Sequence, residues 1–289
     1  MNILITRHDK IGDFCTTLPM FKVLKEQTNH KLFALVSKVN YEFAKNFDFI
    51  DEVLLYEEKP LELNDKIDVS ISAFIDTKLG INLLRSGIKT RIAPATKIAQ
   101  IFFNKRVKQR RSEVLKSEWE YNLDLLKAFD SSLDITFTPP LLNFGFKREN
   151  ITVFHPGFGG SSDGNLTIDE YIKLAKSVED RTKVIFTFGP ADIEAKKHIK
   201  ANTDFEIKDN FSSLWEFTKF LATINVFVST STGPMHLASL SNTKTLSFFG
   251  NTKFASYKRW KPESSDECQR NFLLPTDFDI IVESLKEMI

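Results

Sequence analysis

Cysteine and long apolar runs are both scarce in this sequence, and each scarcity argues against a class of protein. Only Cys15 and Cys268 occur among 289 residues. Two isolated cysteines favour neither a disulfide framework nor a zinc site, and they fit a reducing cytoplasm. The opening Ile3-Leu4-Ile5 is too short for the apolar core of a signal peptide, and no apolar run approaches the roughly 18 residues of a membrane span. We therefore expect a cytoplasmic protein whose contact with a membrane, if any, is peripheral.

A strong excess of one charge is also missing, as are repeats and low-complexity tracts. The formal net charge is +1, which gives no global electrostatic reason to expect nucleic acid as a partner, although a local basic patch remains open. The composition, with 42% hydrophobic and 27% charged residues, is that of a globular protein. The length suits two domains of about 150 residues each.

Short β-rich segments alternate with longer helical segments, and this alternation occurs twice. In the first half we expect strands at residues 2–6, 32–36, 52–56 and 68–73, and helices at 14–26 and 39–46. In the second half we expect strands at 151–155, 183–187, 225–228 and 243–249, and helices near 168–178, 192–200, 212–221 and 234–240. Such alternation is typical of parallel sheets with helices on both faces. The predicted fold class is therefore α/β, with two Rossmann-like domains.

The boundary between the domains is expected near residues 139–150. Pro139-Pro140 and the polar run Lys147-Arg148-Glu149-Asn150 interrupt the pattern there. We predict an N-terminal domain over 1–148 and a second domain over 149–275. The last segment, 276–289, has the pattern of a helix capped by Thr276, and this helix could pack back on the N-terminal domain.

Ligands of open parallel sheets bind at the carboxyl ends of the strands, so the loops that follow the strands are the candidate sites. The loop HPGFGGSSDG (155–164) is rich in glycine, which lets backbone N–H groups approach a phosphate. It is neither a dinucleotide fingerprint, because Ser162 stands where a glycine is needed, nor a P-loop. A flexible surface loop is an equally weighted alternative.

Two further loops lie at the same expected sheet edge. In STSTGPMHLASL (229–240), Thr232 can cap a helix whose first N–H groups favour an anion. After residue 187, Asp192 and Glu194 could hold sugar hydroxyls. An ordinary helix start explains each loop alone, but two anion-suited loops at one edge favour an anion site.

Two charged segments stand out in the first half. The first strand ends in RHDKIGDF (7–14), which is either a solvated turn or the edge of an active site. KRVKQRR (105–111) is either a solvated face or a docking surface for an acidic partner at a membrane. We expect no metal site: the histidines (8, 30, 155, 198 and 236) lack ligand spacing, and helix capping explains Asp277-Phe278-Asp279.

Six segments, in this order, resemble glycosyltransferase family 9, the heptosyltransferases of lipopolysaccharide core synthesis. They are RHDKIGDF, LLRSGIKTRIAP, WEYNLDLLKAF, HPGFGGS, STGPMHLA and FFGNTKFASYKRWKP. The resemblance covers nearly the whole chain and implies a GT-B fold, two Rossmann-like domains facing a cleft. It implies inverting, metal-independent transfer of a heptose from ADP-heptose to Kdo or heptose of an acidic glycolipid at the cytoplasmic face of the inner membrane. No cofactor is implied, and a monomer is favoured.

The resemblance also implies roles for individual residues. Asp13 would be the general base, and Asp9 would remain a solvated turn residue. Gly164 stands where the family commonly has a phosphate-binding lysine, so either the donor sugar is not heptose, or Lys253 or the other domain supplies the phosphate contact. A different nucleotide sugar, a catalytically silent nucleotide-sugar-binding protein and an epimerase of related fold are the alternatives. The donor would contact His155, Gly157, Gly159, Ser161, Ser162, Glu194, Ser231, Thr232, Gly233 and His236, and the acceptor would contact Arg7, Lys10, Gly12, Arg110 and Arg111.

Overall fold

The chain forms two compact units, Met1–Phe137 and Thr138–Ile289. The computed structural model describes residues 1–57, 61, 63, 66–157 and 164–289. The boundary lies ahead of the one expected at residue 148, because the segment after Phe137 is already bonded to the second unit. The Leu142 N–H donates to the Leu240 carbonyl at 2.8 Å, and Arg148 Nη2 donates to the Ser241 carbonyl at 2.7 Å.

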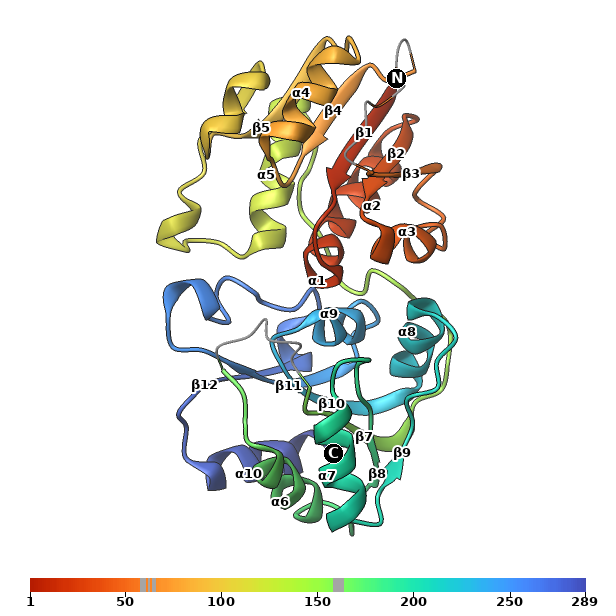
Figure 1. The fold of residues 1–289 in the computed structure, drawn as a ribbon, viewed down its shortest axis with the longest axis vertical. Helices are drawn as coiled ribbons and strands as arrows, with labels where there is room; N and C mark the ends of the chain where they lie inside the picture. The colour runs from red at the N-terminus through yellow and green to blue at the C-terminus, as the bar shows by residue number, and fades with distance from the viewer. Residues whose placement is uncertain (58–60, 62, 64–65, 158–163) are drawn as a thin grey trace. The chain divides into compact units, whose positions relative to one another are not determined.

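The first unit is built on a parallel sheet with the order β3-β2-β1-β4-β5-β6 (Figure 1). β1 lies in the middle and pairs in parallel with both β2 and β4, so its apolar residues are buried on both faces. The strands are β1 (Asn2–Arg7), β2 (Lys31–Val36), β3 (Glu52–Leu55), β4 (Val69–Ser72), β5 (Thr90–Pro94) and β6 (Lys105–Val107). The helices are α1 (Ile11–Cys15), α2 (Leu18–Gln27), α3 (Lys38–Ala44), α4 (Thr77–Arg85) and α5 (Glu118–Phe129), with the short 3-10 helices η1 (Ile98–Phe102) and η2 (Arg111–Glu113).

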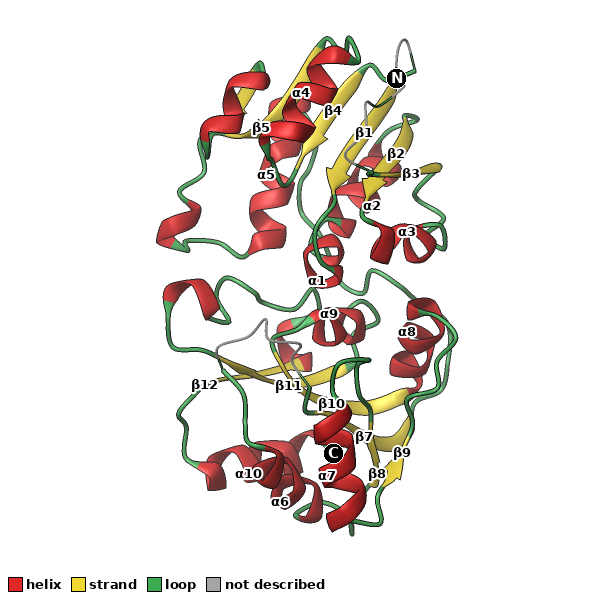
Figure 2. Cartoon of the chain, viewed as in Figure 1, coloured by secondary structure: helices red, strands yellow, loops and turns green. Residues whose placement is uncertain are grey.

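The second unit repeats the same winding, with the order β12-β11-β10-β7-β8-β9 (Figure 2). Its strands are β7 (Glu149–His155), β8 (Lys183–Phe186), β9 (Glu206–Ile207), β10 (Ile224–Thr230), β11 (Lys244–Phe249) and β12 (Gln269–Leu273). Its helices are α6 (Ile168–Lys176), α7 (Ile193–Asn202), α8 (Leu214–Thr223), α9 (Gly233–Ser239) and α10 (Phe278–Met288), with η3 (Lys253–Ala255) and η4 (Asp266–Cys268). The predicted fold class, two Rossmann-like α/β domains, is confirmed.

The strand order identifies where each sheet can bind a ligand. The direction of winding reverses between β1 and β4 in the first sheet and between β7 and β10 in the second. Loops that leave the carboxyl ends of such a strand pair form a crevice in this kind of fold. The loop that contains RHDKIGDF and the two anion-suited loops leave these strands, so their predicted location at the sheet edges is correct.

The C-terminal helix α10 belongs to the second unit. Ile281, Leu285 and Met288 are buried in that unit's hydrophobic core, together with residues of its sheet. The expectation that this helix packs back on the N-terminal domain is therefore wrong, because its apolar stripe covers its own domain. Asp277 caps the helix by accepting the Asp279 N–H at 3.0 Å, one residue after the expected cap. Within the described ranges, the structure contains no helix that is long and apolar enough to span a membrane.

Candidate active site

The first sheet ends in a buried guanidinium between two carboxylates. Arg7 is 4% exposed and donates from Nε to Asp9 Oδ1 at 2.8 Å and from Nη2 to Asp13 Oδ1. Burial alone would lower the pKa of Arg7, but the charges of Asp9, Asp13 and Glu118 raise it above its ordinary value, so the guanidinium stays charged. The assignment of Asp9 to a solvated turn is wrong, since Asp9 is a partly buried partner of Arg7.

Asp13 lies in the first turn of α1, where the helix dipole favours a carboxylate. Its side chain is 18% exposed, and its Oδ1 accepts from Arg7 Nη2. Gly12 is part of the same helix, and its carbonyl accepts the Thr16 N–H at 3.1 Å. Of the two residues assigned to the acceptor here, Gly12 is therefore helical, and Lys10 is exposed just before the helix.

The run KRVKQRR divides between an edge strand and a buried network. Arg111 is 16% exposed and pairs with Glu118 at 2.8 Å, and it also donates to Asn122 Oδ1 at 3.2 Å. Asn122 in turn donates to the Thr16 carbonyl at 3.0 Å, which ties the network to α1. Arg111 thus supports the surroundings of Asp13 rather than a free basic surface. Arg110 is 78% exposed beside Glu113 and remains available for docking.

Sequence reasoning missed a second cluster at this edge, made by the loops after β1, β4 and β5. His8 Nε2 lies 2.6 Å from Asp76 Oδ2, and Asp76 also caps α4 by accepting the Leu79 N–H at 2.8 Å. Burial raises the pKa of Asp76, but the Leu79 N–H and His8 outweigh it and lower the pKa overall. Among the described residues, buried His8 Nδ1 has no hydrogen-bond partner. The available signal was an aspartate in position to cap a helix, four residues after the end of β4.

Lys97 brings a cation to the same edge. Its Nζ lies 4.0 Å from the ring centroid of Phe74, and the rings of Phe74 and His8 are 5.3 Å apart. Lys97 has φ +55, a conformation that a bulky residue rarely adopts. The sequence did not predict this loop as a site, because β5 was not among the expected strands.

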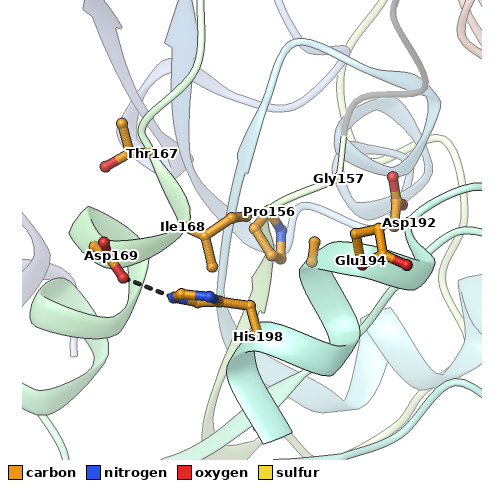
Figure 3. Close-up of a pocket in the computed structure, with 9 residues that line it drawn as sticks. Pro156, Gly157, Thr167, Ile168, Asp169, Asp192, Glu194 and His198 are labelled. Atoms are coloured by element: carbon orange, nitrogen blue, oxygen red, sulfur yellow. Dashed lines mark hydrogen bonds and ion pairs between the residues drawn. The ribbon is translucent and has the colours of Figure 1, made fainter. Parts of the chain in front are cut away.

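A cavity of about 430 Å³ adjoins the carboxyl end of β7 in the second unit (Figure 3). Asp192 Oδ2 accepts the Gly189 N–H at 2.8 Å, and a Cβ at Gly157 would overlap the Asp192 carboxylate. Glu194 is 84% exposed and pairs with Lys197, so Asp192 is the better-fixed acid. The lining residues are Pro156, Gly157, Thr167, Ile168, Asp169, Asp192, Glu194, Ala195 and His198.

The two candidate donor histidines are both buried. His155 is 5% exposed, its Nδ1 lies 2.9 Å from Thr187 Oγ1, and burial lowers its pKa to about 4. His236 Nδ1 lies 3.0 Å from each carboxylate oxygen of Glu263, which also accepts from Ser239 Oγ at 2.7 Å. Glu263 has no exposed surface. Sequence reasoning missed it because the partners are far apart along the chain.

The remaining donor candidates differ in how the structure places them. Ser231 and Thr232 precede α9, and Gly233 begins it. Thr232 occupies the expected cap position, but its Oγ1 donates to the Thr230 carbonyl at 3.3 Å rather than to the helix. A Cβ at Gly164 would overlap the backbone of Phe249 and Gly250. Gly159, Ser161 and Ser162 lie outside the described residues.

The described part of the chain contains no group of three or more His, Cys, Asp and Glu side chains that could hold a metal ion. The charged side chains of the first unit instead satisfy one another through Arg7, Asp9, Asp13 and the His8–Asp76 pair. The arrangement can position a carboxylate and an imidazole, which are groups for proton transfer.

Comparisons with known proteins agree with this two-domain architecture. Residues 96–271 match the sequence profile of glycosyltransferase family 9 (heptosyltransferase). The chain is 35% identical to a Haemophilus influenzae protein named "Putative glycosyltransferase", over 90% of this chain and 85% of that protein. It is 26% identical to lipooligosaccharide heptosyltransferase 2 of Campylobacter jejuni, over 92% of this chain and 86% of that protein. The solved structure of E. coli ADP-heptose lps heptosyltransferase II superposes with a TM-score of 0.82 at 16% sequence identity. The superposition covers 100% of this chain and 98% of that one.

The fold and the sequence match define the class of this protein as a glycosyltransferase of the GT-B type. The chain belongs to glycosyltransferase family 9, the heptosyltransferase family of lipopolysaccharide core synthesis. The family and the enzyme class expected from the sequence are thereby confirmed.

Proposed function

We propose that the protein transfers a heptose from ADP-heptose to a lipopolysaccharide core sugar, with inversion at the anomeric carbon and with Asp13 as general base. The observation that carries the proposal is the Asp13 carboxylate, which is partly exposed in α1, the helix that follows β1, and is held by Arg7. Family membership and the names of the two heptosyltransferase relatives support the donor and acceptor classes.

In this proposal, the two oxygens of the Asp13 carboxylate have different roles. Oδ1 accepts from Arg7, which fixes the side chain, and the other oxygen would accept the proton of the acceptor hydroxyl. As that proton leaves, the hydroxyl oxygen bonds to the anomeric carbon, and the bond from this carbon to the phosphate oxygen of ADP breaks. Attack opposite to the leaving group inverts the anomeric centre. A positioned general base of this kind contributes about 10²–10⁴-fold to a rate.

The leaving ADP accumulates negative charge on its phosphate oxygens, which fixed N–H donors can stabilise. We assign this role to the backbone where α9 begins, at Thr232 and Gly233, with Lys253 as a cation from η3. Gly164 cannot carry the family's lysine without moving the backbone at the end of β11. Asp192, rather than the solvent-facing Glu194, would hold donor hydroxyls. The reaction assigned to these groups requires no metal ion or cofactor.

The acceptor is an anionic glycolipid in this proposal, and cations at the edge of the first sheet would meet it. Lys10, Lys97 and Arg110 are exposed there. Arg7 and Arg111, which sequence analysis also assigned to the acceptor, are engaged with carboxylates. We assign those two to positioning.

One observation favours a second candidate, a GT-B glycosyltransferase with a different nucleotide-sugar donor. The backbone around Gly164 excludes a side chain, so the donor's phosphates must be bound differently from the family's usual manner. Since this affects the donor alone, the transfer chemistry of Asp13 is the same in both candidates.

The test combines a base-deficient variant with a donor panel. Asp13→Asn keeps the shape and the Arg7 contact but removes the base, so turnover should fall by about 10²-fold or more. Stabilisation of the protein by ADP-heptose, measured as a rise in melting temperature, should persist. Asp9→Asn, on the same guanidinium, is the matched control and should retain most of its turnover.

Each other outcome contradicts a different part of the proposal. Turnover of Asp13→Asn near the wild-type rate means that the base is another residue. If another nucleotide sugar stabilises the protein and ADP-heptose does not, the proposed donor is wrong. Donor binding without turnover in the wild type, with every acceptor, means a silent binding protein.

A further inference from the structure

Charge is strongly segregated along the first unit. Residues 77–112 contain no aspartate or glutamate, although the whole chain has a net charge of only +1. Residues 77–112 therefore carry an excess of positive charge, which acidic residues elsewhere in the chain balance. This positive segment comprises α4, β5, η1 and β6, which are consecutive in the chain. The basic residues of this segment are Lys78, Arg85, Lys89, Arg91, Lys97, Lys105, Arg106, Lys108, Arg110 and Arg111.

The short helix η1 holds two isoleucines in solvent within this segment. Ile98 is 83% exposed and Ile101 is 64% exposed. Side chains three residues apart eclipse each other in a 3-10 helix, so these two project to the same side. The opposite side is anchored, because Ala99 is buried and a Cβ at Gly80 of α4 would lie 2.8 Å from Phe102 Cδ2. The isoleucines are therefore held outward by packing.

Further exposed residues adjoin η1 and extend the same surface. Leu84, one turn after Gly80 on α4, is 46% exposed, and Arg85 is exposed beside it. Asn104 Nδ2 donates to the Lys89 carbonyl at 2.6 Å, which fixes that loop next to the end of η1. We call Leu84, Arg85, Lys89, Ile98, Ile101 and Arg106 the η1 surface.

Arg106 faces this surface because of its register. It pairs with Ala93 of β5, and Ala93 belongs to the core that α4 and η1 cover. Neighbouring side chains across a parallel sheet point to the same face. Arg106, exposed on the edge strand β6, therefore lies on the face of η1 rather than on the face of α5.

We propose that the η1 surface docks on an anionic lipid bilayer. A membrane-surface site combines apolar side chains that enter the headgroup region with basic residues that attract anionic lipids, and the η1 surface has both. A nucleic-acid site would instead present aromatic rings for base stacking, whereas Phe102 is half-buried and Phe103 is buried here. The inference concerns a surface other than the Asp13 site, so it goes beyond the proposed function and does not depend on it.

The experiment measures binding of the full chain to vesicles without any donor or acceptor sugar. Vesicles of phosphatidylcholine alone are compared with vesicles of phosphatidylcholine and phosphatidylglycerol, by flotation. The protein should bind the anionic vesicles and release from them as salt rises, because exposed charges are screened within about 8 Å at physiological ionic strength. Equal binding to both vesicles, or to neither at low salt, overturns the proposal.

Two variants separate the apolar and the charged contributions. The double variant Ile98→Ser with Ile101→Ser should weaken vesicle binding severalfold. The control Ile280→Ser, which changes an exposed side chain of α10, should not weaken it. Arg85→Gln, Lys89→Gln and Arg106→Gln together should weaken binding by about tenfold or more, since each basic residue near an anionic surface contributes about fivefold. The matched control removes three exposed lysines of the second unit, Lys173, Lys176 and Lys200, and should bind like the wild type.

Thermal unfolding of every variant verifies that it is folded. If the control triple variant loses as much binding as the η1 triple variant, the net charge of the protein controls vesicle binding rather than the η1 surface, and the proposal is wrong. If the η1 triple variant loses binding to a short oligonucleotide while both η1 variants still bind anionic vesicles, the surface is one for nucleic acid and the proposal is wrong.

Discussion

Arg7 shows how burial changes the role of a charged residue. The family resemblance assigned it to the acceptor, yet it is 4% exposed and bonded to Asp9 and Asp13. Removing one partner of a buried ion pair costs much more than the pair contributes in stability, so Arg7 is committed to these carboxylates. In the proposed reaction, its role is to orient Asp13.

His155 should make the protein less stable in mild acid. Burial lowers its pKa to about 4 in the folded chain, from 6.5. As pH falls from 6.5 towards 4, the unfolded chain binds a proton that the folded chain does not, so the free energy of unfolding decreases. The loss between about pH 7 and about pH 5 should be about 2 kcal/mol from this residue.

Urea unfolding of the wild type and of His155→Gln at both pH values measures this contribution. The variant has no imidazole to protonate, so its free energy of unfolding should decrease about 2 kcal/mol less than that of the wild type over the same interval. Equal decreases in both proteins would show that His155 is accessible to protons in the folded state.

At the scale of secondary structure, the sequence predicted the central strands and missed the short ones. β1, β2, β7 and β11 each have a run of five buried residues, most of them apolar, because both of their faces are buried. β6 is KRV, with two charged residues in three, and β9 has two residues. Such edge strands carry little hydrophobic pattern. β5 (TRIAP) lies between β4 and β6, but it is short and begins with two polar residues, so it and the loop with Lys97 that follows it were not predicted.

The helix expected at 14–26 is interrupted for a local reason. Thr16 and Thr17 hydroxyls donate to the carbonyls of Asp13 and Phe14, and Pro19 lies in the first turn of α2. Proline is suited to a helix start, so α1 ends and α2 begins here. This break leaves Asp13 in a short helix of its own, which periodicity alone could not predict.

Gly164 should be the glycine whose replacement costs most stability. In Gly164→Ala the new methyl group would overlap the backbone of Phe249 and Gly250, which cannot move without shifting the end of β11. Overpacking of this kind costs about 1–3 kcal/mol. Gly157→Ala is the comparison, because its methyl group would meet the Asp192 side chain, which can rotate.

Chemical denaturation of both alanine variants tests this ranking. Gly164→Ala should lose more stability than Gly157→Ala. A Gly164→Ala variant within about 0.5 kcal/mol of the wild type would mean that this backbone yields easily, and a lysine would then be possible at the position.

On the scale of the whole molecule, two units with the same strand order carry different chemistry. The first contains the Arg7–Asp13 and His8–Asp76 pairs, and the second contains Asp192, bonded to the Gly189 N–H, and the His236–Glu263 pair. A shared fold therefore does not decide which unit holds which substrate. The side chains at the strand ends decide it, and these were readable from the sequence only where they follow a recognisable strand.

The fragment 138–289 should fold alone and bind ADP. Its six strands pair only with one another, and its core includes α10, so the interactions that stabilise a domain are within the fragment. Far-UV circular dichroism should show a cooperative thermal transition, and ADP should raise its midpoint by mass action. The midpoint of the fragment 1–137 should be insensitive to ADP. If 138–289 has no cooperative transition, its stability depends on the first unit; if ADP stabilises 1–137 instead, the donor is assigned to the wrong domain.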